Sequence, residues 1–359
     1  MPPPPVPTPA PDAPIRIGMV GVGRFGTHRR KTLRQAGRFD LVACCDRDPA
    51  ALQEACEEER ARPFDSMDRM LGAADLEAIM VSTGADSHAS LALQAMNAGK
   101  HVFIEKPLCS TLEEVGALRE TQRRTGAVVG VGHAHVDLVP SVRLVRTLGE
   151  TGRLGTLVCY EENSSHSGGL EFRRDEWRAT RARNPGGMLF QCGVHALHGL
   201  VHLFGPVRSL SAMMRYDANP ATETADAACV LLRHTSGMIG TLNCYHVTAY
   251  CHEFRIFGTR GNAYIDTFTG AADFQPRKRG GIENREPVEL DPLADDAPVR
   301  NLLEWARAIR TGTDPSPSLD DGMNAVLPVF AAQRAADERR EVLLEELGPP
   351  QVRGLSEKA

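Results

Sequence analysis

Three histidines and a glutamine are spaced along one predicted helix near the middle of the chain. The segment GGMLFQCGVHALHGLVHLFG, residues 186–205, carries them at i, i+4, i+7 and i+11, the spacing of neighbours along one face of an α-helix. They are Gln191, His195, His198 and His202. Four apolar residues fall on another face, which predicts an amphipathic helix: Val194, Leu197, Val201 and Phe204. A row of imidazoles can bind a metal ion, transfer protons or occupy a polar surface.

A metal site is the least favoured of these possibilities. Binding zinc or a similar ion takes three or four ligands, and His166, Glu161 and Glu162 are near enough in sequence to add to the helical histidines. However, the segment has no HExxH motif and no helical carboxylate four residues from a histidine. We therefore expect no metal at this helix.

Proton transfer is a second possibility, and His195 follows Gly193 near the start of the helix. An unperturbed imidazole has a pKa of about 6.5, so it can accept a hydroxyl proton near neutral pH. His202 lies a full turn further along than His198 and is expected to be structural, whereas His198 is open to a structural or a substrate-binding role. The other side chains that could carry the proton are Lys106, Tyr160 and His166.

A glycine-rich turn near the start of the chain indicates a dinucleotide site. The apolar strand at residues 15–20 runs directly into GVGRFG, residues 21–26, and then into a predicted helix that ends near Ala36. In a GxGxxG turn the first glycine permits a tight bend, the second lets a pyrophosphate approach the backbone, and the third lets the helix pack on the strand. The start of the helix then offers oriented N–H groups and partial positive charge to the phosphates.

Asp46 and Arg47 bear on which dinucleotide is bound. Asp46 ends a second apolar strand, LVACC, at the offset from the last glycine that is expected for the acid binding the adenosine ribose hydroxyls. Its carboxylate would repel a 2′-phosphate and therefore favours NAD. Arg47 could instead bind that phosphate, which keeps NADP open.

The chain continues as alternating strands and helices. The predicted strands are 76–83, 101–106 and 127–132, and the predicted helices are about 48–60, 87–98 and 111–125. This alternation indicates a parallel sheet with helices on both faces. Ligands bind such sheets beyond the carboxyl ends of the strands, where TGADSH at 83–88 and EKP at 105–107 are expected to lie.

Lys106 is the strongest catalytic candidate in this region. A lysine after a strand is often only a solvated surface charge, but this strand directs it to the cofactor edge of the sheet. Pro107 constrains the turn that follows, and a cis peptide is one form that this constraint can take. A cation beside a reacting hydroxyl favours its alkoxide character and orients it, which hydride removal requires.

The composition fits a globular protein of two domains. The chain has 359 residues, of which 42% are hydrophobic, and a net charge of -5 with a pI near 6.2, which argues against a nucleic-acid or membrane-surface role. No apolar run approaches the ~20 residues of a membrane-spanning helix. Nine dispersed cysteines without a CxxC pair suit reduced thiols in the cytoplasm. Proline fills eight of the first fourteen positions, and no signal-peptide pattern is present, so a disordered tail is expected there.

Several motifs, in this order, resemble those of the Gfo/Idh/MocA oxidoreductases, the relatives of glucose-fructose oxidoreductase and inositol dehydrogenase. They are GVGRFG, VSTGADSHAS, EKP and the GG…GVHALH stretch. VGHAHVDLVPSVRLVRTLGETGRLG resembles the passage out of that family's nucleotide domain. FRIFGTRGNAYID resembles a strand-turn-strand of its second domain, and SLDDGMNAVLPVFAAQRAADERREV resembles its closing helix. The resemblance covers nearly the whole ordered chain.

The resemblance implies an α/β protein with an N-terminal Rossmann domain and a second α/β domain on a large, mostly antiparallel, open-faced sheet that commonly serves oligomer contacts. It also implies redox chemistry on a sugar, sugar derivative or cyclitol with tightly held NAD(P). Lys106 would contact substrate and nicotinamide, and His195 would accept or donate the proton. The family's commoner pattern, Asp-x-x-x-His-x-x-Asp, is replaced here by Gln191, His195 and His198. Both flanking carboxylates are missing, so the substrate cannot be carried over from the family.

The chain is predicted to contain two domains between two tails, with a defined set of site residues. The domains are a tail at 1–14, a Rossmann domain at 15–134, a substrate and oligomerisation domain at 135–345 and a tail at 346–359. The catalytic residues are Lys106 and His195. The cofactor-binding residues are Gly21, Gly23, Arg24, Phe25, Gly26, Asp46, Arg47, Ser82, Thr83, His88, Glu105 and Lys106. The substrate-binding residues are Lys106, His133, Asn163, His166, Trp177, Arg178, Gln191, His195 and His198.

The predicted function is that of a cytoplasmic dehydrogenase that uses NAD, with NADP as the other option, on the CH–OH group of a sugar, sugar derivative or cyclitol. A homodimer or homotetramer through the second domain's sheet is expected, with no nucleic-acid or membrane partner. Two alternatives stay open. One is redox-assisted glycoside cleavage or epimerisation with transient NAD reduction, and the other is a non-catalytic NAD-binding sensor or scaffold.

Overall fold

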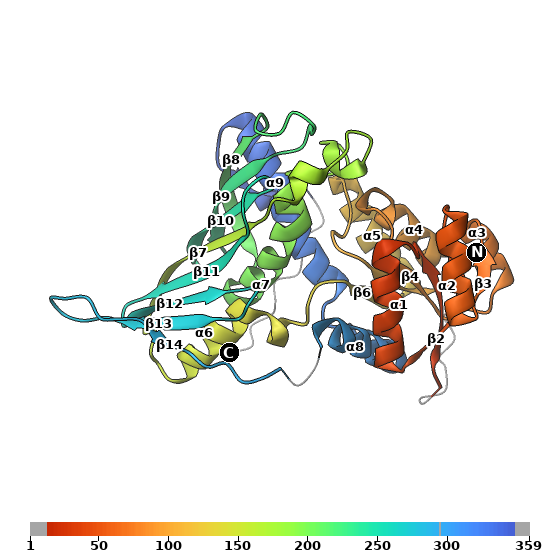
Figure 1. Ribbon diagram of the computed structural model, residues 1–359, viewed down its shortest axis with the longest axis horizontal. Coiled ribbons are helices and arrows are strands. Elements are labelled where there is room, and N and C mark those ends of the chain that lie inside the picture. The colour runs from red at the N-terminus through yellow and green to blue at the C-terminus, as the bar shows by residue number, and fades with distance from the viewer. Residues whose placement is uncertain (1–12, 294–295, 349–359) are drawn as a thin grey trace. The chain divides into compact units, whose positions relative to one another are not determined.

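A parallel sheet of six strands forms the first part of the fold (Figure 1), in the order β3-β2-β1-β4-β5-β6 within the described residues. The computed structural model describes residues 13–293 and 296–348. The strands are β1 Ile15–Val20, β2 Phe39–Cys45, β3 Arg62–Phe64, β4 Ala78–Val81, β5 His101–Ile104 and β6 Val129–Val131. The order reverses at β1, which lies between β2 and β4, and ligands of such sheets bind at this switch point. The predicted parallel sheet is confirmed.

Helices connect these strands, and most begin where the sequence predicts them. They are α1 Arg24–Ala36, α2 Pro49–Glu59, α3 Met67–Ala73, α4 Ala85–Asn97 and α5 Leu112–Thr125, and α8 Ala297–Thr311 joins them from much later in the chain. The Asp48 carboxylate caps α2, and Thr111 with Glu114 forms a capping box at α5. The short elements β3 and α3 were not predicted, because three and seven residues carry too little periodicity to be read.

Helix α8 packs on the first sheet through Trp305. Its fully buried ring stacks on Phe39 of β2 at 5.3 Å and packs against Phe103 of β5 at 5.4 Å. The described chain accordingly divides into a first unit, residues 13–135 and 296–323, and a second unit, 136–293 and 324–348. The predicted second domain ran unbroken from 135 to 345, because an amphipathic helix does not reveal in sequence which sheet it covers. Most of the two predicted tails, residues 1–12 and 349–359, lies outside the described residues.

The second unit is built on a nine-stranded sheet in the described chain, in the order β14-β13-β12-β11-β7-β10-β9-β8-β15. Only the β7–β10 pair is parallel among the described pairs, so the sheet is mostly antiparallel, as predicted. Its strands are β7 Leu157–Ser165, β8 Val207–Arg215, β9 Ala227–His234, β10 Ile239–Tyr245, β11 Cys251–Gly258, β12 Gly261–Asp266, β13 Ala272–Pro276, β14 Glu286–Pro287 and β15 Val342–Leu343. The predicted strand-turn-strand is the β11–β12 hairpin.

The two faces of this sheet differ. On one face Tyr160 of β7 is buried and stacks at 5.1 Å on Phe204 of α7, and α6 packs against α7 and β12. The helices of this unit include α6 Pro140–Glu150 and α7 Val194–Phe204, and α9 spans Leu319–Glu338. The other face carries exposed apolar side chains, among them Met213, Leu231 and Ile239. No helix in the described part of the chain is long and apolar enough to cross a membrane.

The helix predicted for residues 186–205 is only partly an α-helix. Residues Leu189–Gly193 form a π-helical turn, and α7 begins at Val194. Gly187 has a φ of 59°, and a Cβ there would lie 2.0 Å from the Ala225 carbonyl oxygen. A π turn holds one more residue than an α turn. The predicted continuous stripe from Gln191 to His195 is therefore wrong, because the two residues lie in helical turns of different pitch.

Candidate functional site

The three glycines of GVGRFG have different structural roles. Gly21 has a φ of 86°, and a Cβ there would lie 2.7 Å from the Ser82 carbonyl group. A Cβ on Gly26 would lie 2.4 Å from the Gly21 carbonyl oxygen, so this glycine allows the helix to pack on the turn. By contrast, no described atom lies within 4 Å of the position of a Gly23 Cβ. Gly23 therefore leaves an open approach to the backbone.

The groups beside this approach fit a dinucleotide. No side chain of the described residues caps the start of α1, whose 13 residues follow Gly23, so its first N–H groups are available to an anion. At the end of β2 the Asp46 carboxylate accepts from the Val22 N–H at 2.7 Å and from the Asp48 N–H at 3.0 Å. Phosphates would meet helix N–H groups here, and ribose hydroxyls would meet a carboxylate. The exposed side chains of Arg24, Phe25 and Arg47 flank this edge.

The EKP segment follows β5 at the same edge of the sheet. Glu105 is buried and forms an ion pair with Arg29 of α1, and the Arg29 guanidinium lies 5.5 Å from the Phe25 ring and 5.4 Å from the Phe103 ring. The Lys106–Pro107 peptide is cis. Glu105 was predicted to contact the cofactor, but its carboxylate faces Arg29 inside the unit. The buried position of Arg29 could not be predicted from the sequence, because a basic run such as HRRK is typical of a solvated helix surface.

The residues after β4 lie beside the glycine turn. Ser82 is buried, and its Oγ has no hydrogen-bond partner among the described residues. The Thr83 hydroxyl lies 2.7 Å from Ser87 Oγ. His88, on α4, is buried with both ring nitrogens near backbone carbonyl oxygens. The first unit thus brings together the glycine turn, Asp46 and the end of β4.

The three histidines of the predicted helix have different surroundings. His195 is exposed at the second residue of α7, whereas His198 is buried. His202 Nε2 lies 2.7 Å from Nη2 of Arg146 on α6, an ion that can only donate, so this nitrogen accepts the bond. The position of His202 agrees with the structural role expected for it.

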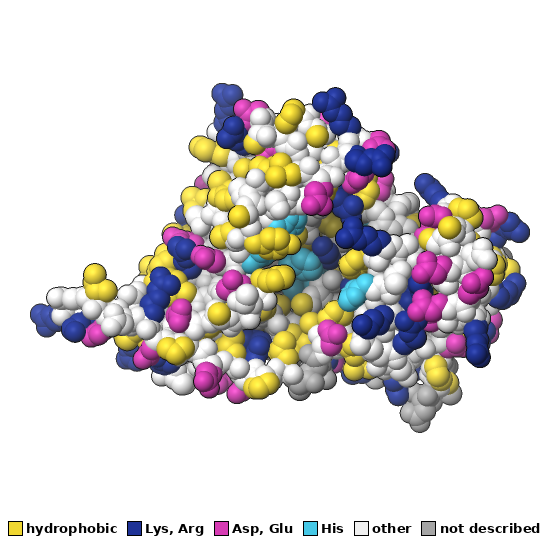
Figure 2. All heavy atoms as spheres, viewed as in Figure 1, with side chains coloured by type: hydrophobic (Ala, Val, Ile, Leu, Met, Phe, Trp, Pro, Cys, Tyr) yellow, Lys and Arg dark blue, Asp and Glu magenta, His cyan; other side chains and the backbone are white. Residues whose placement is uncertain are grey.

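His166 lies beside the π turn. Its Nδ1 accepts from the Gly168 N–H at 2.9 Å, so in the neutral ring Nε2 carries the proton, and it points at Cys192 Sγ 3.6 Å away. The His246 ring is 6.2 Å away, and burial together with His166 lowers the pKa of His246 to about 3. Figure 2 shows histidine side chains gathered among hydrophobic ones on the second unit. The His246 imidazole beside this end of β7 is therefore neutral at physiological pH.

The other predicted substrate residues are spread over both units. Asn163, on β7, accepts a hydrogen bond from Ser165 Oγ, and the Arg178 guanidinium covers the neighbouring Trp177 ring at 4.9 Å. In the first unit His133 is buried, and its carbonyl accepts from Asn301 Nδ2 at 2.5 Å.

Tyr160 was a rival proton carrier, and its contacts are structural. The ring is buried, and its hydroxyl lies 2.8 Å from Nε2 of His234, whose Nδ1 lies 2.7 Å from the Gly205 carbonyl oxygen. Burial raises the pKa of Tyr160 and lowers that of His234. Tyr160 therefore fastens β7 to the end of α7.

The comparisons with known proteins decide the family. A profile of the oxidoreductase family with an NAD-binding Rossmann fold matches residues 15–133, and the Gfo/Idh/MocA C-terminal domain matches residues 142–264. This chain belongs to the Gfo/Idh/MocA oxidoreductases. Its cofactor is accordingly NAD, the dinucleotide that the family's Rossmann domain binds. The resemblance seen in the sequence is confirmed.

Two relatives and one solved structure match most of the chain. The dTDP-3,4-didehydro-2,6-dideoxy-alpha-D-glucose 3-reductase of Saccharopolyspora spinosa is 26% identical, over 91% of this chain and 98% of its own. The myo-inositol 2-dehydrogenase of Thermotoga maritima is 23% identical, over 93% of this chain and 99% of its own. The fold is similar to that of a levoglucosan dehydrogenase solved with NADH and L-sorbose, with a TM-score of 0.80 and 17% identity over 93% of this chain and 100% of that one.

Two glycine variants of this Gfo/Idh/MocA member separate binding from packing. Gly23→Ala is expected to leave the folded structure unchanged and to weaken NADH binding about tenfold or more, because its methyl group occupies the phosphate approach. Gly26→Ala is expected to lower the melting temperature, because its Cβ meets a backbone oxygen at 2.4 Å. NADH fluorescence titration and thermal unfolding measure the two effects. Equal melting losses for both variants would contradict this division of roles.

Glu162 is a buried acid that the sequence suggested only as a possible metal ligand. It lies on the covered face of β7, is 4% exposed, and its Oε2 has no hydrogen-bond partner in the described chain. Burial raises its pKa to about 8. Within the described residues no group of three or more histidine, cysteine, aspartate or glutamate side chains is arranged to hold a metal ion. Glu162 is therefore a protonated carboxylic acid at neutral pH.

Glu162→Gln is expected to change how stability depends on pH. The folded pKa lies above that of the unfolded chain, so the folded state holds an extra proton between about pH 4.5 and 8, and stability falls as pH rises through this range. From pH 5.5 to 7.5 the contribution of this one group falls by about 2–3 kcal/mol. Urea unfolding at the two pH values should show that the wild type changes less favourably with rising pH than Glu162→Gln by this amount. The exposed neighbour variant Glu161→Gln should follow the wild type, and an identical pH dependence in Glu162→Gln would refute the assignment.

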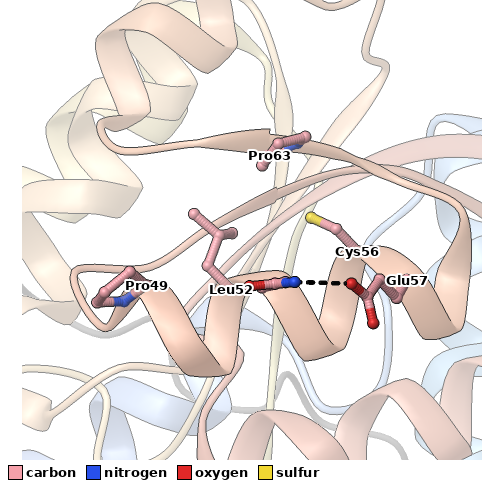
Figure 3. Close-up of a pocket in the computed structure, with 6 residues that line it drawn as sticks. Pro49, Leu52, Cys56, Glu57 and Pro63 are labelled. Carbon is pink, nitrogen blue, oxygen red and sulfur yellow. Dashed lines mark hydrogen bonds between the residues drawn. The ribbon is translucent and has the colours of Figure 1, made fainter.

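A surface pocket elsewhere contains none of the predicted site residues. It has a volume of about 360 Å³, lies between α2 and β3, and is lined by Pro49, Leu52, Gln53, Cys56, Glu57 and Pro63. Figure 3 shows Leu52 and Cys56 of α2 directed toward Pro63. Most of its lining is apolar, and burial raises the pKa of Cys56, so neither an anion nor a reactive thiolate is favoured there. The pocket therefore does not coincide with the candidate cofactor residues at the carboxyl edge of the first sheet.

Proposed function

We propose that this oxidoreductase transfers a hydride between NAD and a CH–OH carbon of a sugar, sugar derivative or cyclitol. Lys106 orients the reacting hydroxyl and favours its alkoxide character, and His195 accepts the hydroxyl proton. The observation that carries the proposal is the position of Lys106. It follows β5 at the carboxyl edge of the parallel sheet, between Glu105 and Pro107. Glu105 is in turn held by its ion pair with Arg29.

The protein's own residues would do the proton chemistry. When bound, NAD supplies the carbon that accepts the hydride. A Lys106 ammonium beside the substrate oxygen stabilises negative charge as it develops there. His195 is exposed at the start of α7, and an imidazole can accept a proton near neutral pH because its unperturbed pKa is about 6.5.

The substrate class is proposed from the relatives and from the side chains available. The two relatives above are named for a dideoxy-hexose nucleotide and for myo-inositol, both ring compounds rich in hydroxyl or keto groups. Here Gln191 and His198 stand in place of the family's commoner carboxylates. Amide and imidazole groups both donate to and accept from hydroxyls without adding a fixed negative charge. We therefore propose a polyol substrate, either neutral or negatively charged, because the site adds no fixed negative charge that would repel it. The residues proposed to contact it are Gln191, His198, Asn163, His166, Trp177, Arg178 and His133.

Cofactor contacts are proposed at the edge described above. Gly21, Gly23 and Gly26 would form the phosphate turn, with Arg24 and Phe25 at its rim. Asp46 would hold the adenosine ribose and favour NAD over NADP, while Arg47 leaves some binding of NADP open. Ser82, Thr83 and Lys106 would lie beside the nicotinamide half of the cofactor. The buried side chains of His88 and Glu105 would hold these residues in position.

We also propose a cytoplasmic homo-oligomer. The exposed face of the nine-stranded sheet carries Met213, Leu231 and Ile239, which are 82%, 55% and 40% exposed, and apolar surface of this kind favours association. All nine cysteines are free thiols, which suits a reducing compartment. Light scattering would measure the oligomer, and a monomer at micromolar concentration would contradict it.

The function is tested by incubating the protein with NAD⁺ and a panel of cyclitols, hexoses, anhydrosugars and nucleotide sugars. We expect absorbance at 340 nm to rise with at least one panel member, more with NAD⁺ than with NADP⁺. His195→Asn should lower kcat by about 10²-fold or more. Product formation without net NADH would instead support transient oxidation, and neither NADH nor product across the panel would support a sensor.

A further inference from the structure

One buried histidine ring spans the ends of two neighbouring strands. His88, on α4, is 1% exposed. Its Nδ1 lies 2.7 Å from the carbonyl oxygen of Pro107, and its Nε2 lies 3.0 Å from that of Thr83. Thr83 follows β4 and Pro107 follows β5, and these strands pair in parallel with Val81 opposite Ile104. The ring therefore joins the loop after β4 to the EKP segment.

The two contacts together define the protonation of the ring. A backbone carbonyl oxygen can only accept, and a neutral imidazole has one N–H donor. Both contacts are hydrogen bonds only if both ring nitrogens carry protons. A neutral ring would turn a nitrogen lone pair toward an oxygen at 2.7 or 3.0 Å in a buried place.

Charged groups from three elements bear on this ring. Burial is the largest effect and lowers the pKa of His88, whereas the carbonyls of Pro107 and Thr83, then Glu105 after β5 and Asp86 on α4, favour the imidazolium. Arg29 of α1 is ion-paired with Glu105 and so offsets part of that carboxylate's charge. The geometry of the two carbonyls decides between these opposing effects, because only the cation satisfies both bonds.

The ring also bears on Lys106, whose neighbours are held on both sides. Glu105, just before it, is fixed by Arg29 from the helix that follows the glycine turn. Pro107, just after it, is fixed through its carbonyl by His88 from the helix that follows the β4 loop. We propose that His88 is a positioning residue, an imidazolium that ties the Thr83 and Pro107 carbonyls together and thereby fixes Lys106. We call this link from the Thr83 carbonyl through His88 to the Pro107 carbonyl the clamp. Its effect on catalysis rests on the proposed function, whereas its existence does not.

The protonation is tested by NMR of protein labelled with ¹⁵N in its twelve histidine rings, without cofactor, at pH 7. The His88 signals are those that disappear in His88→Asn. We expect both His88 nitrogens at the protonated position, each with an observable, slowly exchanging proton. One protonated and one unprotonated nitrogen at pH 7 would overturn the imidazolium.

The positioning is tested without turnover through the chain's five lysines, methylated with ¹³C-formaldehyde and assigned with Lys106→Arg. In His88→Asn and His88→Phe the Lys106 resonance should move while that of Lys31 stays. His28→Asn, an exposed histidine on α1, should move neither. An unmoved Lys106 resonance in both His88 variants, with the folded state retained, would overturn the positioning role.

A kinetic split separates this role from simple stabilisation. With the panel compound that gives NADH, kcat should fall at least about tenfold in both variants, more in His88→Phe than in His88→Asn, which keeps one donor. The Kd of NADH should stay within about threefold. If kcat is unchanged while the protein only melts earlier, His88 is merely structural and the proposal fails. If the wild type makes no NADH but both NMR results hold, the proposed function fails and the clamp stands.

Discussion

Replacing Lys106 with alanine is expected to lower kcat by about 10³-fold, because the only cation proposed to stabilise the substrate alkoxide is removed. The Kd of NADH should change by no more than about threefold, since the glycine turn and Asp46 carry most of the cofactor contacts. Stopped-flow absorbance at 340 nm and NADH fluorescence titration measure the two quantities. The effect should sit mainly in kcat rather than in KM, because the interaction strengthens as charge develops on the oxygen.

Lys31→Ala supplies the matched control for this variant. Lys31 is an exposed lysine on α1, outside the proposed site, and its removal should leave both kcat and Kd unchanged. Full turnover by Lys106→Ala would show that the proposed mechanism is wrong. Loss of NADH binding together with turnover would place Lys106 in cofactor binding rather than in chemistry.

Arg29→Met is expected to destabilise the protein by about 3–5 kcal/mol, the usual cost of leaving a buried charge without its partner. The Arg29 and Glu105 side chains are only 5% and 3% exposed, and their ion pair joins α1 to the end of β5. The double variant Arg29→Met with Glu105→Leu should recover much of this loss, because no buried charge remains. Urea unfolding of the single and double variants measures the coupling.

An exposed ion pair of the same unit provides the comparison. Arg69 and Asp65 lie 2.7 Å apart with side chains 72% and 66% exposed, and Arg69→Met should cost under about 1 kcal/mol because water screens such pairs. If Arg29→Met were as mild as Arg69→Met, the Arg29–Glu105 pair would not hold the EKP segment. If the double variant were less stable than the single one, the loss would come from packing rather than from the unpaired charge.

The parts of the fold that the sequence predicted are those whose signals are local. Strand β1, the glycine turn and α1 lie where the pattern of apolar residues and glycines puts them, because each needs only its own neighbours to form. The same holds for α2 and α5, whose caps are present in the sequence. Gly21 and Gly26 could also be assigned packing roles in advance, since a GxGxxG turn fixes its own geometry.

The parts that the sequence missed depend on contacts between distant residues. The π turn before α7 is set where Gly193 packs against Cys244 of β10, and a Cβ at Gly193 would lie 2.9 Å from that sulfur. The inward orientation of Glu105 depends on Arg29, which is 76 residues earlier in the chain. Likewise, the site of α8 depends on the stacking of Trp305 on Phe39. Periodicity within one segment carries none of this information.

Hydride transfer from a substrate carbon to NAD can be followed by the transfer of an isotope. The panel compound that gives NADH is prepared with deuterium at its CH–OH carbons and incubated with the protein and NAD⁺, and the NADH is analysed by mass spectrometry. We expect the wild type to form NADH carrying one deuterium, and Lys106→Ala to form it about 10³-fold more slowly. Product formed with no deuterium in the NAD pool would contradict hydride transfer to NAD.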